Sequence, residues 1–184
     1  MGGRVCLALL RGINVGGKNL IRMDALRTAF EETGFSCVQT YIQSGNVIFH
    51  AGEPDKAKLT LTIEKNLSQK FGYEARVLLL SLAGYRKIIE GAPAGFGEEP
   101  EKYRYDVWFL MTGLSAGGVI RNISPREGVD WVYGGKGAIY TKRLSSQMGK
   151  SRLAKVIQLP MYQNITIRNW NTSKKLLELM TPHR

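Results

Sequence analysis

The feature that most restricts the fold of this chain is an order of predicted elements that occurs twice. Apolar runs predict strands, and apolar residues three to four positions apart predict helices. In the first half these fall at residues 5–10 (strand), 23–33 (helix), 38–43 and 47–50 (a hairpin), 56–70 (helix) and 75–80 (strand). This is the split β-α-β order of ferredoxin-like folds.

The second half repeats that order. Its predicted elements are 105–111 (strand), 114–123 (a weak helix), 130–133 and 138–142 (a hairpin), 150–159 (helix) and 165–168 (strand), followed by a helix to residue 180 that Asn171 or Thr172 would cap. We predict an α+β fold of two ferredoxin-like lobes, with antiparallel sheets, helices on one face of each, and a C-terminal helix. The predicted boundaries are 1–90 for the first lobe, 91–104 for a Gly- and Pro-rich linker, and 105–184 for the second.

One predicted helix has a competing interpretation. Residues 59–63 read Leu-Thr-Leu-Thr-Ile, an alternation typical of a strand. The longer stripe of Leu59, Ile63, Leu67 and Phe71 has helical spacing, and its length favours the helix.

The charge of the chain indicates its partners. Its 26 Lys and Arg exceed its 15 Asp and Glu by 11, which predicts attraction to nucleic acid, a nucleotide or phosphate. The alternative is simply a basic surface. No apolar run reaches the ~18 residues that a membrane span needs, and no Cys/His cluster predicts a metal site. Cys6 and Cys37 are expected to be buried free thiols of a cytoplasmic protein.

A glycine-rich loop follows the first predicted strand. Residues 12–19 read Gly-Ile-Asn-Val-Gly-Gly-Lys-Asn, close to a phosphate-binding loop, but Asn19 replaces the Ser or Thr that would bind Mg²⁺. A looser anion site fits better, with backbone N–H groups forming a concavity. Its candidate residues are Arg11, Asn14, Gly16, Gly17 and Lys18. The competing interpretation is a structural loop whose glycines permit a tight chain path.

Two further polar motifs stand at strand ends. Gln43, Ser44 and Asn46 surround the predicted hairpin turn and either orient a ligand or only form the turn. Arg168, Trp170 and Asn171 precede the last helix, where an Arg and a Trp can together hold an anionic, base-like ligand. Base-stacking aromatics are sparse on the first and third predicted strands, which disfavours an RNA-recognition motif. No catalytic triad or acid–base pair is evident, so catalytic residues stay unknown.

Three motifs together carry a family resemblance. They are residues 9–18 (LLRGINVGGK), 41–49 (YIQSGNVIF) and 168–172 (RNWNT), the last before a leucine-rich helix. The chain resembles the bacterial family catalogued as domain of unknown function 1697, and the likeness extends over nearly its whole length. The resemblance implies an α+β fold of two ferredoxin-like lobes and brings no activity, cofactor or catalytic residue.

The function expected from these observations is binding of an anionic ligand, nucleic acid or nucleotide-like, in a basic, Gly/Asn-rich cleft between the lobes. No cofactor is predicted. One alternative is an enzyme that acts on a small phosphorylated substrate. Another is a structural or partner-binding module, in which the motifs only hold the lobes together. The oligomeric state does not follow from the sequence.

Overall fold

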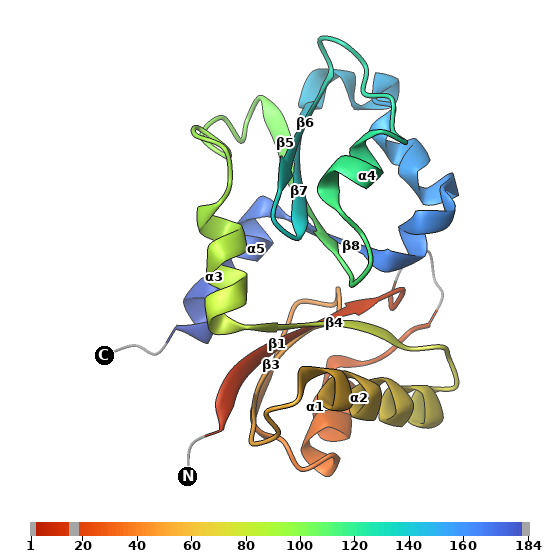
Figure 1. The fold of residues 1–184 in the computed structure, drawn as a ribbon, viewed down its shortest axis with the longest axis vertical. Coiled ribbons are helices and arrows are strands. Elements are labelled where there is room, and N and C mark those ends of the chain that lie inside the picture. Colours follow the sequence, from red (N-terminus) through yellow and green to blue (C-terminus); the bar gives the residue numbers. More distant parts are fainter. Residues whose placement is uncertain (1–2, 15–18, 182–184) are drawn as a thin grey trace. The chain divides into compact units, whose positions relative to one another are not determined.

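The structure is a computed structural model that describes residues 3–14 and 19–181. Its elements confirm an α+β fold: two four-stranded antiparallel sheets with helices, and a C-terminal helix (Figure 1). The described chain divides into two compact units. One comprises the residues up to Tyr85 together with those from Leu176 onward, and the other comprises Arg86–Lys175.

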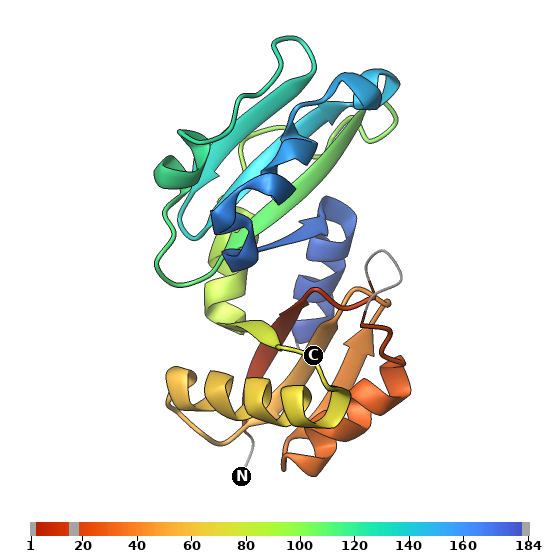
Figure 2. The same ribbon diagram turned by 90° about the vertical axis from the view of Figure 1, so that its right-hand side faces the viewer.

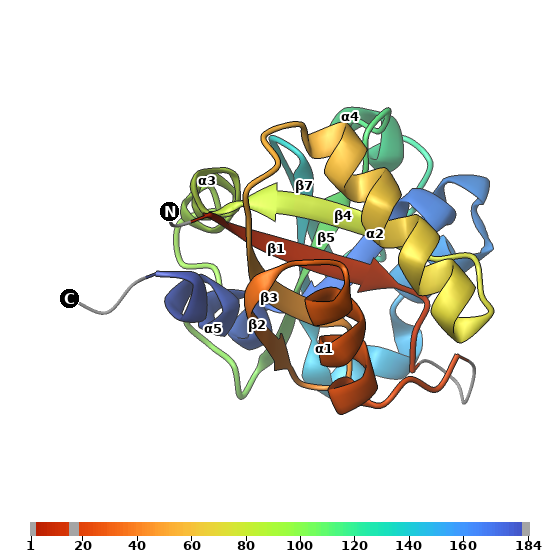
Figure 3. The ribbon, with the colours of Figure 1, turned by 90° about the horizontal axis from the view of Figure 1, so that it is seen from below.

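The first unit contains one sheet in the order β2-β3-β1-β4. Its elements are β1 (Arg4–Arg11), α1 (Met23–Glu32), β2 (Ser36–Tyr41), β3 (Asn46–Ala51), α2 (Lys56–Phe71) and β4 (Arg76–Ser81). Helices α1 and α2 lie on the same face of this sheet (Figure 3). Their buried side chains, such as Leu26, Phe30 and Ile63, form one core with Ala8 and Phe49 of the sheet.

The helical interpretation of residues 59–63 is confirmed, since they lie within α2. The helix begins at a cap in which Asp55 Oδ1 accepts hydrogen bonds from the backbone N–H groups of Ala57 and Lys58, at 2.8 and 3.2 Å. Leu59, Ile63 and Leu67 are buried, whereas Leu61 is exposed. Only helical spacing separates these residues in that way.

The second unit contains a sheet in the order β6-β7-β5-β8. Its elements are β5 (Tyr103–Leu110), α4 (Ala116–Ile120), β6 (Asp130–Gly135), β7 (Ala138–Leu144), the 3₁₀ helices η1 (Ser145–Lys150), η2 (Leu153–Gln158) and η3 (Pro160–Asn164), and β8 (Ile165–Asn169). Helices α3 (Leu82–Glu90) and α5 (Trp170–Met180) each include residues of both units. The 3₁₀ helices run beside the second sheet (Figure 2).

The prediction of one α-helix over 150–159 is wrong. The segment contains the end of η1 at Lys150 and the 3₁₀ helix η2, and Pro160, directly after it, begins η3. A 3₁₀ helix has three residues per turn, so side chains three apart share a face. Leu153 and Val156 accordingly lie in the core, whereas Ile157, which an α-helix would place beside Leu153, is 61% exposed.

The last helix also differs from expectation at its start. Asn169 Oδ1 accepts a hydrogen bond from the backbone N–H of Asn171 at 3.0 Å, so Asn169 occupies the capping position. Asn171 and Thr172, the two predicted caps, are inside α5.

The prediction that both thiols are buried is half wrong. Cys6 is buried in β1, where burial raises the pKa of its thiol. Cys37 is exposed, because β2 is irregular between Ser36 and Gln39 and Cys37 there adopts a positive φ of 51°.

These environments predict different thiol reactivity. A colorimetric thiol reagent should modify Cys37 of the native protein rapidly and leave Cys6 unmodified until a denaturant is added. Quantifying the released chromophore should give one equivalent natively and two after unfolding. A Cys37→Ser variant should lose the rapid phase, and rapid modification of that variant would contradict the burial of Cys6.

Candidate functional site

The described part of the glycine-rich loop is held by the side chain of Asn14. Its Nδ2 donates to the backbone oxygens of Ile21 at 3.0 Å and Gln43 at 2.9 Å, and its Oδ1 accepts from the backbone N–H of Ile21 at 2.8 Å. Asn14 has a φ of 54°, a region that asparagine tolerates better than most residues. Its amide therefore closes the loop and joins it to the β2–β3 turn.

The β2–β3 turn is fixed in a similar way. Asn46 is fully buried, and its Nδ2 donates to Tyr41 O and Ser44 Oγ, both at 2.9 Å. Gly45 O accepts a hydrogen bond from Leu10 N at 2.8 Å, and a Cβ at Gly45 would lie 2.8 Å from Leu10 Cβ. Only glycine fits this approach, where φ is 72°.

The first two predicted motifs are thus brought together, because their loops contact each other at this end of the first sheet. The described members of these motifs are Arg11, Asn14, Gln43, Ser44 and Asn46. The structure gives structural roles to Asn14 and Asn46. Gly16, Gly17 and Lys18 lie outside the described residues. The proposed ligand role of this group stays a prediction.

The third motif lies in the second unit. Arg168 is 7% exposed, and its Nη1 donates to Thr166 Oγ1 at 2.9 Å and to Ile167 O at 2.8 Å. The Trp170 ring meets Phe96 edge to face, with centroids 5.1 Å apart. Asn171 is exposed. That the three motifs meet in one cleft stays a prediction.

Trp170 also fixes the chain path at Gly97. A Cβ at Gly97 would lie 2.3 Å from the Trp170 ring, and φ there is 94°. This contact anchors the segment before β5, including Phe96, which also packs on Tyr105 and Tyr140 at centroid distances of 4.9 and 5.6 Å.

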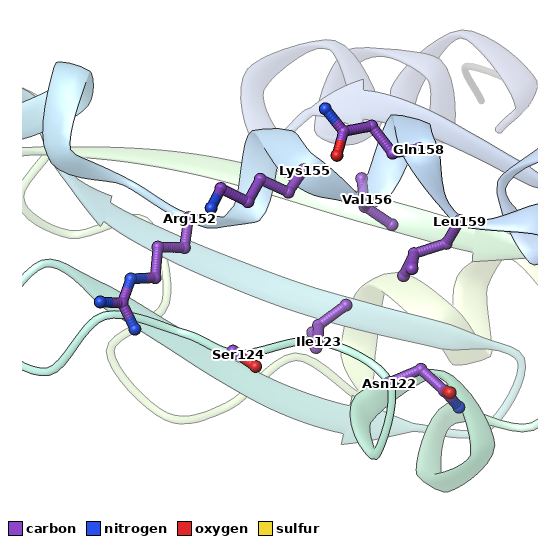
Figure 4. Close-up of a pocket in the computed structure, with 8 residues that line it drawn as sticks. All are labelled: Asn122, Ile123, Ser124, Arg152, Lys155, Val156, Gln158 and Leu159. Carbon is purple, nitrogen blue, oxygen red and sulfur yellow. The ribbon is translucent and has the colours of Figure 1, made fainter.

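The second unit contains two cavities with polar and charged linings. The first, which we name the Arg152 cavity, has a volume of about 440 Å³ (Figure 4). It is lined by Asn122, Ile123, Ser124, Arg152, Lys155, Val156, Gln158 and Leu159. Ile123, Val156 and Leu159 group at one end, while Arg152 extends toward Ser124.

Both cations of this cavity are available to a ligand. Arg152 and Lys155 are exposed, and neither side chain forms a salt bridge within the described ranges 3–14 and 19–181. The side chain of Asp130 holds the start of η2 in place. Its Oδ2 accepts hydrogen bonds from the backbone N–H groups of Arg126 and Arg152, both at 2.9 Å.

The second cavity, the Tyr105 cavity, has a volume of about 380 Å³. It is lined by Gly97, Pro100, Tyr103, Arg104, Tyr105, Ser145, Asn169, Trp170 and Asn171. It therefore includes two of the residues predicted from the sequence, Trp170 and Asn171.

Sequence reasoning missed the residues of the Arg152 cavity, although a signal for them exists. From Trp131 to Leu177, 47 residues contain nine Lys and Arg and no Asp or Glu. Arg86–Lys175 has 15 basic against 7 acidic residues, a net charge of +8 out of the +11 of the whole chain. The basic excess is concentrated in the second unit.

Comparison with known proteins identifies the family. Residues 4–140 match the family described as "Protein of unknown function (DUF1697)". The chain belongs to this DUF1697 family. A solved structure, of the conserved bacterial protein SP0830 from Streptococcus pneumoniae, is similar to this chain at 30% sequence identity and a TM-score of 0.83. The similarity covers 97% of this chain and 99% of that one, and no curated protein matches.

Two further features of this DUF1697 chain concern metal ions and membranes. Over residues 3–14 and 19–181, no three His, Cys, Asp or Glu side chains are grouped so that they could hold a metal ion. None of the helices within those ranges is long and apolar enough to cross a bilayer.

The roles of Asn14 and Gln43 lead to a first prediction for the site. Asn14→Ala should lower the free energy of unfolding by about 2 kcal/mol, because it leaves Ile21 and Gln43 backbone groups without partners. Urea denaturation measures this. Asn14→Gly is the matched variant that keeps a positive φ favourable and removes the same hydrogen bonds. Unchanged stability in both variants would contradict the structural role.

The close approach of Gly97 to Trp170 leads to a second prediction for the site. Gly97→Ala should destabilise the protein by about 2 kcal/mol or more, because the new methyl overlaps the Trp170 ring. Gly95→Ala is the control, since Gly95 has a φ of 72° but a Cβ there would meet nothing closer than Glu98 Oε2 at 3.5 Å. Equal thermal midpoints for the two variants would show that the Trp170 contact is not restrictive.

Proposed function

We propose that this protein binds an anionic ligand, nucleic acid or nucleotide-like, and that the Arg152 cavity is the place where phosphate groups are held. The observation that carries the proposal is a pair of cations, Arg152 and Lys155, that have no salt-bridge partner among the described residues and line a cavity of a unit whose net charge is +8. Guanidinium and ammonium groups are the side chains that bind phosphate through charge-assisted hydrogen bonds.

The neighbouring side chains complement the two cations. Asn122, Ser124 and Gln158 supply neutral amide and hydroxyl groups at the same cavity, and such groups orient a ligand without competing for charge. No carboxylate lines the cavity. An anion entering it would therefore meet these donors, while the carboxylate of Asp130 lies behind the backbone of Arg152 and outside the lining.

The apolar members of the lining explain how the cations are held. Val156 is buried in the second core, and Ile123 and Leu159 pack against that core. Because Val156 follows Lys155 directly and Leu153 follows Arg152, burial of Leu153 and Val156 directs the two preceding residues outward. The packing of η2 thus preorganises the cationic wall.

The test is binding of labelled single-stranded RNA and of duplex DNA to the full chain by fluorescence anisotropy, at several salt concentrations. The logarithm of the affinity should fall linearly with the logarithm of salt concentration. Arg152→Ala with Lys155→Ala should weaken binding tenfold or more and lower the magnitude of that slope by about 1.4 for RNA and about 1.8 for duplex DNA, since about two phosphate contacts are lost.

The matched control removes the same charge elsewhere. Lys87 and Lys174 are exposed in the same unit and line neither cavity. Lys87→Ala with Lys174→Ala should weaken binding much less. Equal effects of the two double variants would reduce the proposal to non-specific attraction, and no binding to either nucleic acid at low salt would direct the search to small phosphorylated molecules.

A further inference from the structure

The Arg152 cavity has two chemically different ends. Arg152, Lys155 and Ser124 lie toward one end (Figure 4). Ile123 and Leu159 lie toward the other. A ligand that fills the cavity therefore carries its charge on one side and a less polar body on the other. The inference drawn from this difference rests on the proposed function, because it names the class of phosphate that the same cavity holds.

The two cations lie one turn apart on one short segment. Arg152 is the N-cap residue of η2, and Lys155 is its third residue. Residues three apart share a face of a 3₁₀ helix, and one turn rises by about 6 Å. The Lys155 side chain extends toward Arg152 (Figure 4). Both side chains are long enough to reach a single phosphate group placed between them.

The charge of the lining favours one class of phosphate over another. The lining has two cations and no carboxylate, and the neighbouring Asp130 is 5% exposed behind the backbone of Arg152. A phosphomonoester carries a charge of about −1.5 to −2 at pH 7 and has three strong acceptor oxygens. A phosphate within a nucleic-acid strand is a diester with a single negative charge. One monoester therefore matches the two cations in charge, whereas one diester matches only half of it.

The other end of the cavity suits the body of a nucleoside. Val156 is buried there, and Ile123 and Leu159 are half-buried, so the floor of this end is apolar. Gln158 adds a side-chain amide, which has both a donor and an acceptor, as the edge of a base does. The volume of about 440 Å³ is within the usual range for small-ligand sites. No aromatic ring lines the cavity, so recognition depends on the phosphate more than on stacking.

We infer that the Arg152 cavity binds a nucleoside phosphomonoester, with its phosphate between Arg152 and Lys155 and its nucleoside over Ile123 and Leu159. Two sources have this chemistry. One is a free nucleotide, and the other is the phosphorylated end of a nucleic-acid strand.

Competition against a labelled single-stranded RNA, followed by fluorescence anisotropy of the full chain, tests the inference. The competitors are short RNAs of one sequence that end in hydroxyl groups, in a 5′- or 3′-phosphate, or in the methyl ester of that phosphate. An RNA with a terminal phosphate should compete about tenfold better than the RNA with hydroxyl ends, because charge-assisted hydrogen bonds are added. The methyl ester should lose most of this gain, because it has the single charge of a diester.

The cation pair is tested in the same assay. Arg152→Ala with Lys155→Ala should abolish the preference for a terminal phosphate. Arg152→Lys with Lys155→Arg exchanges the two cations and should retain most of it. Lys87→Ala with Lys174→Ala removes the same charge elsewhere and should leave the preference unchanged. Thermal midpoints should stay the same in both alanine variants, because all four side chains are exposed.

AMP identifies the source of the phosphomonoester, by competition and by direct isothermal titration calorimetry. AMP that binds as well as the phosphorylated RNA supports a free nucleotide, and weaker AMP binding supports a strand end. In either case adenosine and inorganic phosphate should bind more weakly than AMP, because each fills only one end of the cavity.

Several results would overturn the inference. If hydroxyl-ended and phosphorylated RNAs compete equally and the Arg152/Lys155 alanine variant weakens both, internal phosphates are bound, and the proposed function stands without the inference. A preference for terminal phosphate that survives in that variant would assign the end to another site. Inorganic phosphate that binds as tightly as AMP would remove the role of the apolar end. Equal weakening of RNA binding by the two alanine variants would overturn the proposed function and the inference together.

Discussion

The central strand of each sheet is the constraint on which the rest of the structure depends. Strand β1 is paired with β3 and β4, and β5 is paired with β7 and β8. Residues of both faces are buried, as Leu7 and Ala8 in β1 and Val107 and Trp108 in β5 show. Strands that are paired on both edges and buried on both faces leave no room for ligand groups. Groups that could bind a ligand are therefore expected at strand ends and connections.

The two units use those connections differently. In the first, the polar side chains at the strand ends satisfy backbone groups, as the bonds of Asn14 and Asn46 show. In the second, the connection that contains η2 carries Arg152 and Lys155, which form no salt bridge within the residues that the structure describes. The excess of basic residues lies in the same unit. These contrasts are the reason for placing the proposed anion site in the second unit.

Much of the fold follows from the sequence, because buried residues recur at the regular spacing of a helix or a strand. Alternation and helical spacing predicted α2 and the strands that pair around β1, and the structure confirms them. The prediction failed in segments whose backbone does not follow a regular α-helix or strand. The run 150–159 contains apolar residues that fit an α-helix, yet the 3₁₀ turns selected Leu153 and Val156 for the core and exposed Ile157. Cys37 was misplaced because a β-bulge is not visible in a residue pattern.

The candidate site was harder to predict than the fold. Gly- and Asn-rich motifs attract attention because they look like ligand loops, but asparagine also satisfies backbone groups, and Asn14 does so here. Arg152 and Lys155 stand in no motif, and only their position on a short helix packed by Val156 makes them a wall. The composition predicted an anionic partner, but locating the candidate binding site required the three-dimensional structure. The ferredoxin-like description of each lobe stays a prediction.

The central claim is that phosphate groups are held in the Arg152 cavity, and an NMR titration tests it most directly. The full chain, labelled with ¹⁵N, would be titrated with inorganic pyrophosphate while backbone amide shifts are followed. The account predicts saturable shifts that concentrate at residues 122–124 and 152–159. Shifts that concentrate in other segments, or small unsaturable changes spread over all basic surfaces, would contradict it.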